Sequence, residues 1–121
     1  MESRSINELN YEQVQDIINK KTPMNAIFID VRGPDEYSAG HIPGAYNVPL
    51  DTVDSAFKSS SADFESSYKF KKPTPNDKNS NIILYCQKGM RSRKAAKILQ
   101  DIGYTENLLL YPNGYGEYGQ K

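Results

Sequence analysis

A single cysteine, Cys86, is followed by a short loop that could make its thiol reactive. The six residues CQKGMR, 86–91, contain one glycine and two cations, Lys88 and Arg91. If this loop turns back over the sulfur, its backbone N–H groups and positive charges stabilise a thiolate and any anion beside it. A cysteine in such surroundings is more easily ionised and becomes a nucleophile.

Two other interpretations compete with a reactive thiol. Unpaired cysteines are among the most buried residues, so Cys86 could be an inert core side chain; the glycine and two cations beside it argue against that. A cysteine phosphatase or arsenate reductase also holds a thiolate in a ring of amides. Phosphatases, however, place five residues between cysteine and arginine, whereas Arg91 follows Cys86 after four, and Ser92 occupies the arginine position. The spacing therefore argues against phosphate chemistry.

The elements around Cys86 predict that it lies at the edge of a sheet. A β-rich run, 81–85, precedes it, and a helix is expected over 91–102, with apolar residues at helical spacing and Gly103 at its C-cap. Open parallel sheets bind ligands at the carboxyl ends of their strands. We therefore expect Cys86 and its loop at that edge.

The rest of the chain alternates helical and strand patterns. Asn10 and Gln13 predict a capped helix within 10–20, which Pro23 follows. The other expected elements are a strand over 26–31, a turn or short helix over 33–40, a turn over 41–45, a brief strand over 45–48, short helices over about 52–57 and 62–69, an exposed loop over 71–80 and a strand over 107–111. This alternation predicts an α/β fold with a parallel sheet of about five strands, flanked by helices on both faces.

Composition excludes several classes of function. A chain of 121 residues predicts one domain, 1–121, and its 15 basic and 15 acidic residues give no field of one sign for nucleic acid or a membrane surface. One cysteine provides neither an internal disulfide nor a structural zinc site. No metal or other cofactor is expected. No apolar run approaches the roughly 20 residues of a membrane span, and no clear transit peptide precedes residue 10. We expect a cytoplasmic protein, with the mitochondrion as the alternative.

Two blocks of the chain resemble the rhodanese family, specifically its small single-domain thiosulfate sulfurtransferases of the thiosulfate:glutathione type. The first is FIDVRGPDEYSAGHIPGAYNVP, 28–49, and the second is CQKGMR with its helix. The likeness extends from the helix after Ile6 to GYTENLLLYPNGYGEY, 103–118, with one departure at Tyr118, where many relatives carry tryptophan. The resemblance implies the three-layer rhodanese-like fold.

The resemblance also implies a ping-pong sulfur transfer. The Cys86 thiolate attacks the outer sulfur of thiosulfate, sulfite leaves, and the resulting persulfide passes its sulfur to glutathione, a thioredoxin-like thiol or cyanide. The loop residues expected to bind the donor or supply amides are Gln87, Lys88, Gly89, Met90, Arg91 and Ser92, with the two cations on the sulfonate. A non-catalytic binding or regulatory module of the same fold is the alternative from another class.

Further residues are expected to support this loop. The resemblance implies that Asp30, Arg32 and Glu36 brace it, with Arg32 paired to Glu36. His41, the only histidine, is expected to bond backbone in a turn instead of acting as a base. Within the cluster RSRK, 91–94, only the first arginine is expected to face the loop.

The tyrosines of the C-terminal part have two interpretations. Tyr104 and Tyr111 are expected in the core. For Tyr115 and Tyr118 the two interpretations are packing against the fold and contact with the substrate.

Overall fold

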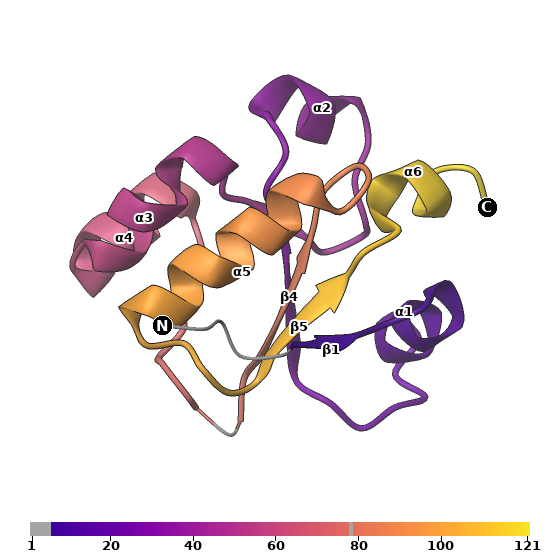
Figure 1. Cartoon of the computed structure of the whole chain (residues 1–121), viewed down its shortest axis with the longest axis horizontal. Coiled ribbons are helices and arrows are strands. Elements are labelled where there is room, and N and C mark those ends of the chain that lie inside the picture. Colours follow the sequence, from indigo (N-terminus) through magenta and orange to yellow (C-terminus); the bar gives the residue numbers. More distant parts are fainter. Residues whose placement is uncertain (1–5, 78) are drawn as a thin grey trace.

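Five parallel strands form one sheet in a computed structural model that describes residues 6–77 and 79–121. Its strand order is β1-β5-β4-β2-β3, and Figure 1 labels β1, β5 and β4 of this sheet. The strands are β1 (Asn7–Glu8), β2 (Ala26–Asp30), β3 (Tyr46–Asn47), β4 (Asn81–Tyr85) and β5 (Leu108–Tyr111). The helices are α1 (Tyr11–Ile18), α2 (Pro34–Ala39), α3 (Leu50–Lys58), α4 (Ser61–Tyr68), α5 (Met90–Ile102) and α6 (Gly114–Tyr118). The α/β fold and the five-stranded parallel sheet are as predicted.

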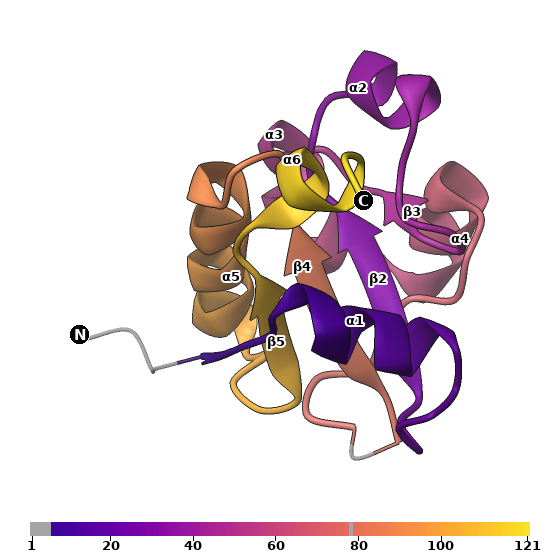
Figure 2. The same ribbon diagram turned by 90° about the vertical axis from the view of Figure 1, so that its right-hand side faces the viewer.

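The register of the central strands places their carboxyl ends at one level. Tyr85 at the end of β4 pairs with Asp30 of β2 on one side and with Tyr111 of β5 on the other. The residues that follow these strands therefore meet at one edge of the sheet, and Cys86 is among them. Figure 2 shows α2 and α6 at this edge.

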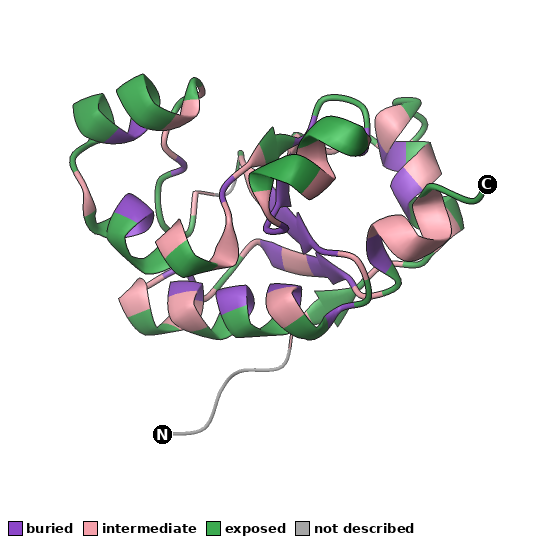
Figure 3. Cartoon of the chain, turned by 90° about the horizontal axis from the view of Figure 1, so that it is seen from above, coloured by how far each residue is buried: buried purple, intermediate pink, exposed green. Residues whose placement is uncertain are grey.

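The sheet separates two apolar layers. Alternate residues of β4 face opposite sides, so Ile82, Leu84 and Cys86 pack with α3, α4 and α5, while Ile83 and Tyr85 pack with α1. Figure 1 shows α3, α4 and α5 on one side of the sheet and α1 and α6 on the other. The buried residues line the sheet and the inward sides of the helices in Figure 3. The prediction of helices on both faces is confirmed.

Helix α5 follows the Cys86 loop directly and fixes its far end. Its buried positions are Ser92, Ala95, Ala96 and Leu99, and three of these are small enough to bring the helix close to the sheet. Gly103 ends it with a φ of 129°, a backbone conformation that favours glycine. At 13 residues α5 is the longest helix in the described part of the chain, where none has the length and apolar character to cross a membrane.

Three features differ from the sequence prediction. The two-residue strand β1 beside β5 and the short helix α6 were not expected. The loop 71–80, expected to be exposed, contains buried Pro73, whose carbonyl accepts a 2.6 Å hydrogen bond from the Tyr104 hydroxyl. Tyr104 is itself buried, as predicted, and its hydroxyl needs a partner there, which draws this loop onto the core.

Candidate active site

Cys86 lies directly after β4, only 1% exposed, beneath the loop that joins this strand to α5. Gly89 turns this loop with a φ of 98° and donates its backbone N–H to the Cys86 Sγ over 3.0 Å. A residue with a side chain rarely adopts this backbone conformation. Gly89 therefore both allows the turn and aims a backbone amide at the sulfur.

The surroundings of the Cys86 thiol favour its ionised form. Burial opposes ionisation, but hydrogen bonds from the Ser92 amide and hydroxyl and from the Gly89 and Lys88 amides outweigh it, so that the pKa lies below its ordinary value. A thiolate stabilised by amides needs no histidine base. The site can therefore present a nucleophilic sulfur.

The Ser92 side chain is a second polar contact of the sulfur. Its Oγ lies 3.6 Å from the Cys86 Sγ and donates to the Gly89 carbonyl over 3.1 Å. Ser92 is fully buried, so water does not compete for its hydroxyl. In the thiol state Sγ donates to Oγ, and rotation of the Ser92 hydroxyl provides a donor for the thiolate. Only the backbone amide of Ser92 was expected to take part in the site. The contact between its hydroxyl and the Cys86 sulfur was not expected.

Arg32 and Asp30 form a buried ion pair beneath the loop. The Arg32 Nη2 lies 2.7 Å from the Asp30 Oδ2, and the two side chains are 3% and 0% exposed. The guanidinium also donates to the Gly40 carbonyl over 2.6 Å and to the Gln87 Oε1 over 3.1 Å. Arg32 thus connects β2, the end of α2 and the loop.

Glu36 pairs with Arg91, so the predicted pairing of Glu36 with Arg32 is wrong. The Arg91 Nη1 and Nη2 lie 2.6 Å and 3.0 Å from the two Glu36 carboxylate oxygens. This bond lowers the pKa of Glu36 to about 2 and raises the pKa of Arg91. Glu36 pairs with Arg91 because Arg32 is buried beside Asp30, whereas Arg91 at the start of α5 faces α2 across the carboxyl edge of the sheet.

A pocket of about 410 Å³ borders this ion pair. Arg91 and Glu36 line one part of it, and the starts of α2 and α3 supply the rest through Gly33, Pro34, Pro49, Leu50 and Asp51, together with Val31. The pocket thus lies between α2, the start of α3 and Arg91, the last residue of the CQKGMR loop.

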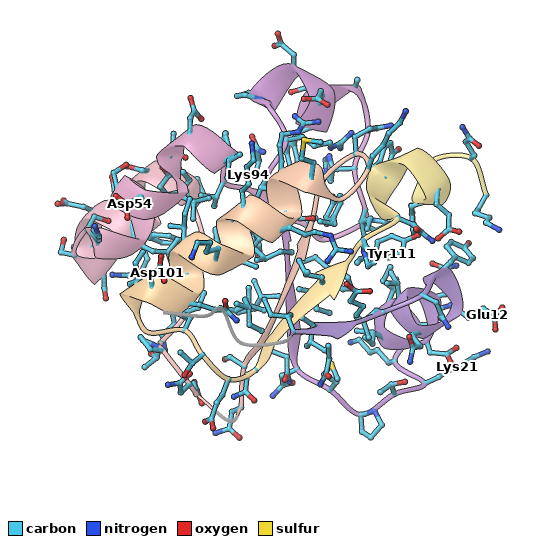
Figure 4. All side chains as sticks on the ribbon, viewed as in Figure 1. Glu12, Lys21, Asp54, Lys94, Asp101 and Tyr111 are labelled. Atoms are coloured by element: carbon cyan, nitrogen blue, oxygen red, sulfur yellow. The ribbon has the colours of Figure 1, made fainter. Side chains whose placement is uncertain are left out.

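The other loop side chains point to solvent. Lys88 is exposed, and Met90 is 72% exposed. Further along α5, Arg93 bonds Glu8 over 2.8 Å, and Lys94, labelled in Figure 4, is exposed. These positions agree with the expectation that the later cations of the cluster RSRK do not face the loop.

His41 has a local structural role. Its Nδ1 lies 2.8 Å from the Tyr37 carbonyl, and its ring stacks on the Tyr37 ring at 3.8 Å. The predicted hydrogen bond to backbone is confirmed.

The tyrosines of α6 lie near the site but pack differently. The Tyr115 ring covers the Arg32 guanidinium at 4.5 Å, whereas Tyr118 packs against Tyr11 at 5.7 Å. Tyr111, labelled in Figure 4, is buried as predicted. Its hydroxyl donates to the Glu117 Oε1 over 2.8 Å.

Helix α6 also reaches the loop through its backbone, which the sequence did not predict. The Tyr115 N–H donates to the Cys86 carbonyl over 2.8 Å, and the Gly116 N–H donates to the Gln87 carbonyl over 3.0 Å. The only sequence signal was the pair of glycines in GYGEY, which permits a close approach of two backbones.

In the part of the chain that the structure describes, metal ligands do not gather around Cys86. Among residues 6–77 and 79–121, no group of three or more His, Cys, Asp and Glu side chains is placed to hold a metal ion.

Comparisons with known proteins agree with the fold. The model of the rhodanese-like domain matches residues 10–121. The chain is 34% identical over 114 residues to the thiosulfate:glutathione sulfurtransferase of Saccharomyces cerevisiae, covering 94% of this chain and 78% of that protein. It is 29% identical over 108 residues to the mitochondrial thiosulfate sulfurtransferase RDL2 of the same yeast, covering 89% and 69%. Since that name places RDL2 in the mitochondrion, the cytoplasmic location of the present chain stays a prediction.

A solved structure is similar over nearly the same length. The human single-domain sulfurtransferase TSTD1 superposes with a TM-score of 0.84 at 26% identity, covering 97% of this chain and 98% of that one.

Proposed function

Because the chain belongs to the rhodanese-like domain family, we propose that it is a sulfurtransferase that moves the outer sulfur of thiosulfate to a thiol acceptor through Cys86. The observation that carries this proposal is the 3.0 Å hydrogen bond from the Gly89 amide to a buried sulfur whose pKa is lowered. The names of the yeast relatives supply the substrate class.

In the first half of the reaction the Cys86 thiolate attacks the outer sulfur of thiosulfate. A bond forms between Sγ and that sulfur, the bond to the sulfonate sulfur breaks, and sulfite leaves with the electron pair. The cysteine then carries a persulfide anion. The loop amides and the Ser92 hydroxyl that face Sγ would stabilise this negative charge as an oxyanion hole does.

In the second half an acceptor thiolate attacks the terminal sulfur and releases the Cys86 thiolate. Glutathione is the acceptor favoured by the name of the Saccharomyces cerevisiae relative. A thioredoxin-like thiol or cyanide would react by the same displacement. The pocket of about 410 Å³ beside Arg91 and Glu36 offers space for an acceptor next to the loop.

The cations of the loop would attract the anionic donor. Lys88 is exposed and free to approach the sulfonate, whereas Arg91 must share its charge with Glu36. Arg32 and Asp30 would act indirectly, because they hold Gln87 and the end of α2 in place.

Intact mass spectrometry tests the proposal. The protein is weighed before and after incubation with thiosulfate, beside the Cys86→Ser variant, and dithiothreitol is added at the end. We expect the wild type to gain the mass of one sulfur, dithiothreitol to remove it, and Cys86→Ser to gain nothing. Reversal by a thiol is required because sulfinic acid adds nearly the same mass and is not reduced by thiols. A wild type that gains no thiol-reversible sulfur would contradict the proposal and favour a binding module.

A further inference from the structure

The first turn of α6 holds the back of the Cys86 loop. The backbone N–H groups of Tyr115 and Gly116 donate to two successive loop carbonyls, those of Cys86 and Gln87, over 2.8 Å and 3.0 Å. Both carbonyls belong to the peptide groups that immediately follow the sulfur-bearing residue. Helix α6 therefore fixes the orientation of these two peptide planes.

Glycines make this close approach possible. A Cβ at Gly116 would lie 2.8 Å from the Gln87 carbonyl oxygen, and a Cβ at Gly114 would overlap the Cys86 carbonyl. A Cβ at Gly89 would lie 2.7 Å from the carbonyl oxygen of Pro112, just before α6. The two segments are thus packed backbone to backbone, and a single methyl group at any of these positions would separate them.

The planarity of the peptide group links these contacts to the nucleophile. In a trans peptide the carbonyl and the following N–H point in opposite directions. When the Gln87 carbonyl points to α6, the Lys88 N–H must point away from it. The Lys88 amide is one of the groups that stabilise the Cys86 thiolate, and the next amide, Gly89, bonds Sγ over 3.0 Å.

We propose that α6 is a positioning element for the nucleophile: by holding the Cys86 and Gln87 carbonyls from behind, it keeps the loop amides directed at the sulfur. This inference deepens the proposed sulfurtransferase function and rests on it. Residues Tyr115 and Gly116 act through the loop and do not touch Sγ. They therefore affect the reactivity of Cys86 without being among the groups that contact its sulfur.

The pH dependence of Cys86 alkylation by iodoacetamide tests this inference in the Gly116→Ala variant. Alanine favours helix more than glycine does, so a purely local effect on α6 would leave the thiol unchanged or stabilise the protein. We expect instead that the added methyl displaces the Gln87 carbonyl. The alkylation midpoint should move to higher pH, and the rate below the midpoint should fall about tenfold, as for the loss of one hydrogen bond to a charged group.

Gly44→Ala is the matched control. Gly44 has a φ of 81°, which alanine rarely adopts, and a Cβ there would meet nothing within 4 Å, so this variant strains the backbone without touching the Cys86 loop or α6. We expect its alkylation midpoint to match that of the wild type. If Gly116→Ala, folded by circular dichroism, also keeps the wild-type midpoint, the inference is overturned.

A measurement on the wild type keeps the inference testable if Gly116→Ala fails to fold. In an NMR pH titration, the amide signals of Lys88 and Gly89 should follow the ionisation of Cys86, and the Gly116 amide should be protected from solvent exchange. A Lys88 amide signal that does not change during the titration would overturn the inference, as would a Gly116 amide that is not protected from solvent exchange. Neither measurement uses thiosulfate. If the wild type takes up no sulfur from thiosulfate, the proposed function fails, but the alkylation and NMR results still test the role of α6.

Discussion

Changing the charges of the Glu36 and Arg91 pair is expected to move the KM for thiosulfate in opposite directions. The two side chains are joined by contacts of 2.6 Å and 3.0 Å, so the carboxylate cancels much of the positive charge that Arg91 would offer to an anionic donor. Glu36→Gln keeps the size of the side chain and an oxygen acceptor for Arg91 but removes the negative charge. Arg91→Ala removes the cation itself.

The exposure of the pair sets the size of both effects. Arg91 and Glu36 are 36% and 41% exposed, so water screens their charges substantially. For a screened charge facing a dianion we take about 1 kcal/mol, which corresponds to a KM about fivefold lower in Glu36→Gln. Loss of a charged donor costs about 1.5 kcal/mol at the lower end of its range, which raises the KM about tenfold in Arg91→Ala.

Initial rates against thiosulfate concentration, at constant acceptor and ionic strength, measure these changes. The salt bridge between Arg93 and Glu8 supplies the control: it is a 2.8 Å contact of the same helix, and Arg93→Ala should leave the KM unchanged. Because the pKa of Glu36 is about 2, its carboxylate stays charged from pH 6 to pH 8, and the effect of Glu36→Gln should be equal at both. If both Glu36→Gln and Arg91→Ala raise the KM, the pair works as a mechanical tie between α2 and α5, and the electrostatic reasoning is refuted.

Two further predictions concern the thiol and the buried ion pair. Ser92→Ala removes the hydroxyl that lies 3.6 Å from Sγ, so the pKa of Cys86 should rise and alkylation below its midpoint should slow about tenfold; an unchanged pH profile would show that the hydroxyl does not act on the thiolate. Arg32→Ala leaves the Asp30 carboxylate buried without its cation and should lower the free energy of unfolding in urea by about 3–5 kcal/mol. Lys58→Ala, which breaks an exposed helical pair, should cost at most about 0.5 kcal/mol, and a similar small loss in Arg32→Ala would contradict this account.

The central elements of the fold could be predicted because their sequences carry their own periodicity. The apolar run of β4 and the helical spacing of α5 placed Cys86 at the carboxyl edge of the sheet, where the structure has it. The capping box of Asn10 and Gln13 is present at the start of α1. In each case the signal lies within one element and needs no information from the rest of the chain.

The contacts between elements could not be predicted in the same way. Arg91 and Glu36 lie far apart in the sequence, and only the folded sheet brings α5 and α2 together. Helix α6 has two glycines in five residues and little intrinsic helical preference, so its sequence does not indicate a helix. Its N–H groups bond the carbonyls of another segment, and the stability of α6 depends on that tertiary contact.

The position of α6 in the chain sets when the thiol acquires its properties during synthesis. A ribosome releases the chain from its N-terminus onward, so Cys86 emerges before α5, β5 and α6. Until these segments dock, the sulfur lacks the Ser92 hydroxyl and the oriented amides that favour its charge. A nascent chain therefore carries a cysteine of ordinary reactivity, and the reactive sulfur appears only when the later segments have folded over it.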